Sequence, residues 1–132
     1  MKQAVDTRQK IQTFEELRPV LARGSWTILA GEFDPLTPAL AARVQSRVLP
    51  RCRLLAVIQP GSDALLDAPS RAVLIAALRA VDAVMIETSD EWRAFAATNP
   101  DLRIIDDRKA CMRDRLEFER LVIGRYVTSE DS

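Results

Sequence analysis

Residues 26–40 have the sequence WTILAGEFDPLTPAL, and the arrangement of the whole chain can be worked out from them. The apolar run at residues 26–30 has the length and the β-forming residues of a buried strand. The polar turn that follows leads to Thr37 and Pro38, which suit the N-cap and the first position of a helix. A buried strand that passes through a short turn into a helix predicts the first half of a strand–helix–strand unit.

The same alternation continues along the chain. Further apolar runs predict strands at residues 53–58, 81–86 and 102–105, with helices between them. All four runs are continuously apolar, which is typical of parallel strands buried on both faces. The sequence therefore predicts a three-layer α/β/α, Rossmann-like domain with a parallel sheet of four or five strands.

Helices are predicted around this sheet. Two of them start with the capping-box pattern, at residues 13–16 and 88–91. The last helix, residues 109–127, has apolar residues at helical spacing: Met112, Leu116, Val122 and Tyr126. The predicted domain spans residues 11–127, between a flexible segment at residues 1–10 and a polar tail at residues 128–132.

The composition restricts the chemistry of the chain. A length of 132 residues fits one domain, and equal numbers of basic and acidic residues, 19 of each, predict no nucleic-acid partner. The chain has no histidine, which excludes a catalytic triad, an imidazole metal site and histidine acid–base catalysis. Cys52 and Cys111 are too few for a disulfide scaffold and predict reduced thiols in a cytoplasmic protein. No apolar run reaches the roughly 20 residues of a membrane span, so no membrane partner is expected.

The predicted fold indicates where a ligand would bind. In an open parallel sheet, ligands lie beyond the carboxyl ends of the strands. The segment after the first strand, residues 31–38, is therefore the candidate binding segment, and the free N–H groups of the helix that follows suit a phosphate. The glycine-rich motifs of dinucleotide sites and P-loops are absent from the sequence.

Residues 31–36, GEFDPL, resemble the G-x-F-D-x-L segment of the cytidylyltransferase-like nucleotidyltransferases. Residues 10–17 resemble the lead-in helix of that domain, and residues 71–84 resemble its R-x-x-x-L-A-A-L-R-x-V-D-x-V unit. The likeness is strongest to the adenylyltransferase domain of bifunctional heptose-phosphate kinase/adenylyltransferases. It covers residues 10–105, and it implies a strand order of 3-2-1-4-5 and nucleotidyl transfer from ATP or CTP to a sugar or polyol phosphate.

The chain departs from this family at the catalytic motif. In the family, G-x-F-D-x-L continues into H-x-G-H, whose histidines contact the triphosphate and stabilise the pentavalent transition state; here residues 37–40 are TPAL. Residues 105–107, IDD, replace the family's lysine-glycine-glycine element, and its C-terminal I-S-T-[ST] motif has no counterpart. Removing one preorganised donor typically costs about 10²- to 10³-fold in rate. The resemblance therefore implies a domain with impaired catalysis.

The candidate nucleotide- or phosphate-binding residues are Gly31, Phe33, Asp34, Thr37 and Arg71. Structural alternatives exist for most of them. Phe33 suits the core, Asp34 an Asx turn, and Thr37 a helix N-cap. The side chain of Arg71 suits a surface or salt-bridge position.

A magnesium site is a further candidate. The carboxylates of Asp34, Asp106 and Asp107 follow predicted strand ends and are suitable ligands for Mg²⁺. Asp106 and Asp107 equally suit the N-cap of the last helix.

Three functions remain open from the sequence. The first is a nucleotidyltransferase-like domain with impaired catalysis that keeps nucleotide, nucleotide-sugar or phosphate binding. The second is an active nucleotidyltransferase that uses Thr37, nearby basic residues and Mg²⁺ in place of the histidines. The third is a structural or interaction module with a closed pocket. The expected protein partners are a second copy of the chain or a kinase-type chain.

Overall fold

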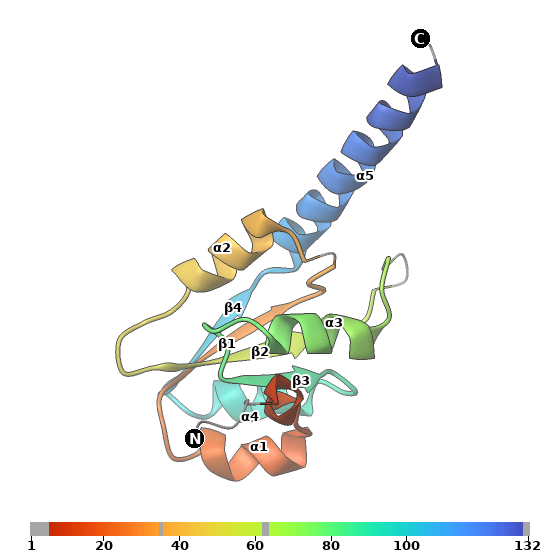
Figure 1. The fold of residues 1–132 in the computed structure, drawn as a ribbon. Helices are drawn as coiled ribbons and strands as arrows, with labels where there is room; N and C mark the ends of the chain where they lie inside the picture. The colour runs from red at the N-terminus through yellow and green to blue at the C-terminus, as the bar shows by residue number, and fades with distance from the viewer. Residues whose placement is uncertain (1–5, 35, 62–63, 131–132) are drawn as a thin grey trace.

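The computed structural model covers residues 6–34, 36–61 and 64–130, with side chains described for all of these except 114, 115, 118 and 123–130. Four parallel strands at its centre lie in the order β3-β2-β1-β4 (Figure 1). They are β1 (Trp26–Gly31), β2 (Arg53–Ile58), β3 (Ala83–Ile86) and β4 (Leu102–Asp106). The predicted α/β class is confirmed, and the order of these strands agrees with the order that the resemblance implies.

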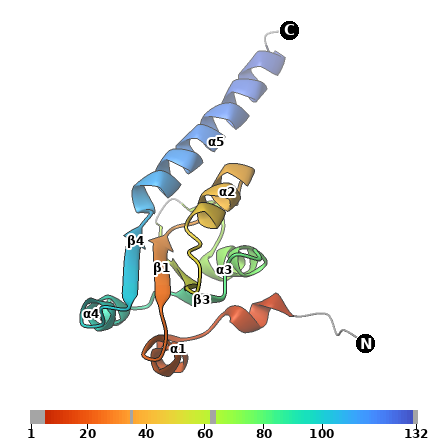
Figure 2. The ribbon, with the colours of Figure 1, turned by 90° about the vertical axis from the view of Figure 1, so that its left-hand side faces the viewer.

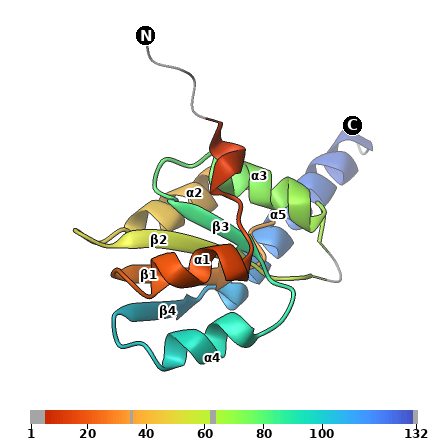
Figure 3. The same ribbon diagram turned by 90° about the horizontal axis from the view of Figure 1, so that it is seen from below.

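Helices cover both faces of the sheet (Figures 2 and 3). On one face lie α1 (Phe14–Leu21) and α4 (Glu91–Ala97), and on the other lie α2 (Pro38–Ser46) and α3 (Ala68–Ala76). Each interface holds its own apolar cluster, and neighbouring residues of β1 alternate between the two: Ile28 and Ala30 belong to one and Leu29 to the other. Burial on both faces is the physical reason for the continuously apolar strands.

The start of α1 confirms one of the two predicted capping boxes. Thr13 Oγ1 accepts a hydrogen bond from the Glu16 N–H at 3.2 Å, and the Glu16 carboxylate accepts one from the Thr13 N–H at 3.0 Å. The second prediction is wrong. The N-cap of α4 is Asp90, which makes no side-chain cap, and Ser89 Oγ accepts a hydrogen bond from the Glu91 N–H at 3.4 Å instead.

Helical structure extends into parts of both segments that were expected to be irregular. The 3-10 helix η1 (Thr7–Lys10) lies within the segment expected to be flexible, and the Lys10 ammonium donates to the Leu78 carbonyl at 3.2 Å. Ile11 then forms a parallel bridge with Val84, so this segment pairs with edge strand β3. Residues 1–5 lie outside the described part of the chain. At the other end, α5 (Arg108–Glu130) includes residues 128–130 of the predicted tail.

α5 extends away from the sheet, as Figures 1 and 2 show. Its N-terminal part contacts β1 and α2. Three members of its predicted apolar face are exposed, with 42% of Met112, 52% of Leu116 and 51% of Val122 accessible. The side chain of Tyr126, the fourth member, lies outside the described residues. None of the helices in the described residues has the length and apolar character needed to cross a membrane.

Candidate functional site

Polar side chains are buried where the strands end. Six polar or charged residues are buried among those described, and five of them gather at the carboxyl edge of the sheet. We call these five residues the carboxyl-edge cluster: Glu32, Asp34, Gln59, Arg71 and Asp107. Parallel α/β sheets bind their ligands at this edge, so the cluster occupies the expected place of a functional site.

Arg71 lies at the centre of the cluster. It is only 3% exposed, so the predicted surface position is wrong, and its hydrogen bonds go to carbonyls in place of the predicted salt bridge. Its guanidinium donates to the carbonyls of Glu32 at 2.7 Å, Gln59 at 2.9 Å and Leu66 at 3.1 Å. These carbonyls follow β1, follow β2 and precede α3, so one side chain joins three segments of the chain.

Asp34 holds the loop that precedes α3. Its carboxylate accepts hydrogen bonds from the N–H groups of Leu65 and Leu66, the latter at 3.0 Å. An Asx turn would bond within a few residues of Asp34, whereas these partners lie more than thirty residues further along the chain. The carboxylate therefore joins two distant loops.

Gly31 and Phe33 pack against the interior of the protein. Phe33 is 1% exposed, which confirms its predicted core position, and its backbone has a φ of 53°, in the left-handed region. A Cβ atom at Gly31 would lie 2.9 Å from Cys111 Sγ, closer than side chains pack. The glycine is thus required by the approach of α5.

Residues 37–40, the TPAL segment, form the N-cap and start of α2. Thr37 Oγ1 accepts a hydrogen bond from the Leu40 N–H at 3.1 Å, which confirms the predicted N-cap. The hydroxyl keeps its own proton for donation to a further acceptor. Leu40 is 1% exposed and belongs to the apolar cluster under α2. Position 40 is therefore part of the core.

The two aspartates after β4 have different surroundings. Asp107 is 3% exposed and accepts a hydrogen bond from Arg43 Nε at 2.8 Å, with Arg47 Nη2 at 3.9 Å. Asp106 is exposed, and its side chain accepts a hydrogen bond from the Arg108 N–H at 3.1 Å, as predicted for a residue at the start of a helix. Asp107 instead ties the start of α5 to α2.

The geometry gives no support to a magnesium site. Within residues 6–34, 36–61 and 64–130, no three side chains of Asp, Glu or Cys form a group that could hold a metal ion. The carboxylates of Asp34 and Asp107 already bind main-chain N–H groups and an arginine, respectively. These residues therefore do not fit the proposed ion.

Three residues at this edge escaped the sequence analysis. Gln59 is 5% exposed, and its Oε1 has no hydrogen-bond partner among the described residues. Arg108 and Lys109 follow the predicted aspartates and line a hollow of about 460 Å³. The sequence signal for the latter two is a pair of adjacent cations that directly follows the two aspartates at a strand end.

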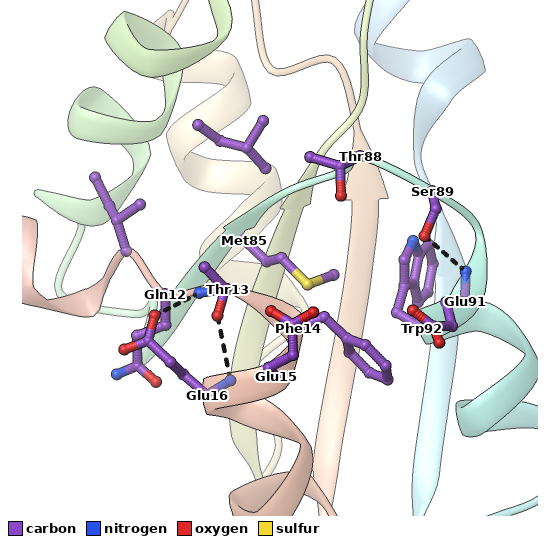
Figure 4. A pocket seen from close by; sticks show the side chains of 12 residues that line it. Gln12, Thr13, Phe14, Glu15, Glu16, Met85, Thr88, Ser89, Glu91 and Trp92 are labelled. Carbon is purple, nitrogen blue, oxygen red and sulfur yellow. Dashed lines mark hydrogen bonds between the residues drawn. The ribbon is translucent and has the colours of Figure 1, made fainter.

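A second hollow, of about 390 Å³, lies between α1 and α4 (Figure 4). Its apolar lining includes Phe14 and Met85, and its polar groups include the α1 capping box. Glu15 and Glu91 also line this hollow, which we call the α1/α4 groove. The acidic lining makes the groove a poor site for a phosphate.

The buried thiol of Cys111 should react slowly. Burial raises the pKa of Cys111 from 9.0 to about 11, and the side chain is 2% exposed. We expect alkylation at pH 8 to modify half-buried Cys52 at least about 100-fold faster, because the thiolate is the nucleophile. Mass spectrometry of the wild type and of Cys52→Ser would follow the two rates; equal rates would contradict this burial.

The same shift predicts the pH dependence of stability. The Cys111 thiol has a pKa near 9 in the unfolded protein, whereas in the folded protein it keeps its proton to about pH 11. Unfolding therefore becomes easier as pH rises through this window. Cys111→Ala should remove this part of the alkaline loss in urea unfolding measured between pH 8 and pH 11.

Comparison with protein-family models found no match to the chain, and comparison with curated proteins also found none.

Proposed function

We propose that this chain is a nucleotidyltransferase-like domain that does not catalyse nucleotidyl transfer and that keeps binding of a phosphate-bearing ligand at the carboxyl edge. The observation that carries the proposal is the bonding of the carboxyl-edge cluster. Arg71 and Asp34 bind the protein's own main chain, and Asp107 binds Arg43. Groups held in this way support the fold, which leaves them less able to stabilise a reacting phosphate.

The chemistry of phosphoryl and nucleotidyl transfer explains why this matters. Catalysis depends on positioning and on donors aimed at the charge that develops on the phosphorus oxygens. Thr37 offers one hydroxyl proton at the start of α2, whereas Leu40 offers none and is buried. The carboxylates of Asp34 and Asp107 add negative charge at the same edge. This combination disfavours turnover.

Retained binding is supported by different residues. Arg108 and Lys109 line the hollow at the start of α5, and Asp106 lines it too. Arg108 Nη2 lies 4.0 Å from Glu32 Oε1, whereas Lys109 makes no ion pair within the described residues. The dipole of the helix also favours an anion at this end. Binding of this kind needs no catalytic histidine.

The test of lost catalysis is a pyrophosphate-release assay with ATP or CTP, Mg²⁺ and a panel of sugar and polyol phosphates. We expect no release above the protein-free background. Release at enzyme-like rates that Thr37→Ala abolishes would overturn the proposal and favour an active enzyme.

The test of retained binding is thermal unfolding with ATP, CTP and nucleotide-sugars. A ligand at 100 times its Kd stabilises the folded state by about 2.7 kcal/mol, which raises Tm by several degrees. Arg108→Gln/Lys109→Gln should reduce the shift, whereas the exposed Arg79→Gln should leave it unchanged. No shift in the wild type would instead favour a closed interaction module.

A second role, self-association, is favoured by α5. Its exposed apolar residues Met112 and Leu116 share one helical face with Lys109, Arg113 and Arg120, which are also exposed. The α1/α4 groove has the complementary character, an apolar floor with Glu15 and Glu91 at its sides. The occupant that these charges favour is α5 of a second copy, seated in that groove.

A further inference from the structure

A basic pocket lies at the opposite edge of the sheet from the carboxyl-edge cluster. It has a volume of about 380 Å³ and lies where β1 and β2 begin. Trp26 and Arg53 are the first residues of these strands and pair with each other in the sheet. Arg23 and Arg51, from the segments that lead into the two strands, complete its charged lining. We call it the amino-edge pocket.

The charge of this pocket is not neutralised. Its lining holds three arginines and no acidic residue, in a chain with a net charge of zero. In the part of the chain that the structure describes, the side chains of Arg23 and Arg51 make no hydrogen bond or ion pair. The guanidinium of Arg53 lies 5.7 Å from the centre of the Trp26 ring, which braces it. Three exposed guanidinium groups therefore face solvent around one concave surface.

The backbone of Arg51 provides an independent observation. Its φ is 60°, in the left-handed region where a residue with a Cβ is strained and glycine is favoured. The short link between α2 and β2 needs this conformation, yet an arginine occupies the position. Strained non-glycine residues concentrate at functional sites. The strain points to a use for the Arg51 side chain that glycine could not serve.

We propose that the amino-edge pocket binds an anion with two or more linked phosphates, such as inorganic triphosphate or the phosphate chain of a nucleotide. Arginine matches phosphate oxygens with paired N–H donors, and three such groups offset most of the negative charge of a triphosphate. A volume of 380 Å³ lies within the range of small-molecule sites. Trp26 is only 3% exposed, so it offers no free face to a base. Recognition therefore depends on the phosphates, and ATP, CTP and inorganic triphosphate bind with similar affinity.

The test is isothermal titration with inorganic triphosphate, ATP and CTP at low ionic strength. All variants carry Arg108→Gln and Lys109→Gln, which removes the two cations of the hollow at the start of α5. The key variant is Arg51→Gly, which removes one cation and also the backbone strain. It should weaken triphosphate binding by about 10-fold or more while the Tm of the free protein rises by about 2–5 °C. Arg23→Gln should weaken binding similarly.

The matched control is Arg79→Gln, which removes an exposed charge elsewhere and should leave the affinity unchanged. Raising the salt concentration should weaken all remaining binding, because exposed charges are screened. The proposal is overturned by unchanged affinity in Arg51→Gly, by an equal loss in Arg79→Gln, or by no binding in the Arg108→Gln/Lys109→Gln background. It does not rest on the proposed function, since a catalytically active carboxyl edge would leave these results unaltered.

Discussion

Replacement of Arg71 by methionine is expected to lower the free energy of unfolding by about 3–5 kcal/mol. The guanidinium is buried and donates to three main-chain carbonyls, those of Glu32, Gln59 and Leu66. Methionine fills a similar length but donates nothing, so it leaves these acceptors without their partner. Each unsatisfied buried polar group costs about 1–3 kcal/mol, and hydrogen bonds from a charged donor lie at the upper end of that range.

Urea unfolding followed by circular dichroism measures this loss. Arg71→Lys should recover only part of it, because an ammonium lacks the planar fork that reaches three carbonyls at once. Arg79→Met is the matched control, since Arg79 lies just beyond the same helix and is exposed. Its effect should stay within about 0.5 kcal/mol. A loss below about 1 kcal/mol in Arg71→Met would mean that the three contacts contribute little to the fold.

The expected loss also bears on function. Nε and Nη1 of this side chain join the ends of β1 and β2 to the loop before α3, so the guanidinium cannot move toward a ligand without releasing three segments. Arg71 lies in the stretch whose sequence resembles a unit of the nucleotidyltransferases, which is why it is a predicted phosphate contact. Its bonds show that it holds the carboxyl edge together, and its contact with a phosphate stays a prediction.

The strands could be predicted closely from the sequence. Residues 53–58 were predicted as a strand and form β2 with the same bounds, and β1 and β4 each extend one residue beyond their predictions. Buried parallel strands are continuous apolar runs, and this signal is local. The N-caps at Thr13 and Thr37 were predictable for the same reason, since the groups involved lie three residues apart.

The candidate site was less predictable, because its bonds are not local. Asp34 and Leu66 lie 32 residues apart, and Arg43 and Asp107 lie 64 apart. No spacing pattern signals such partners before the fold is known. The left-handed backbone of Arg51 was equally hidden, since sequence patterns favour glycine or asparagine at such positions.

The exposed face of α5 leads to the second large effect, the loss of self-association on charge reversal. Wild-type protein is expected to form concentration-dependent oligomers in light scattering coupled to size-exclusion chromatography. Leu116→Glu should weaken association by about 10- to 100-fold, because burial of one leucine contributes about 1.5–3 kcal/mol. Arg113→Glu/Arg120→Glu should also dissociate the oligomers, since the sides of the α1/α4 groove carry glutamates.

Charge exchange identifies the groove as the partner surface. Glu15→Arg/Glu91→Arg alone should dissociate the protein, and its mixture with Arg113→Glu/Arg120→Glu should restore association, because each groove then meets a helix of opposite charge. Arg79→Glu is the control, because it changes the net charge at an exposed residue outside both surfaces. It should leave the oligomers intact. A contact between the helix of one copy and the groove of another is head-to-tail. It closes into a dimer if each copy places its α5 in the groove of the other, and otherwise it extends into chains. A monomeric wild type at all concentrations, or failure of the mixture to associate, would show that α5 does not occupy this groove.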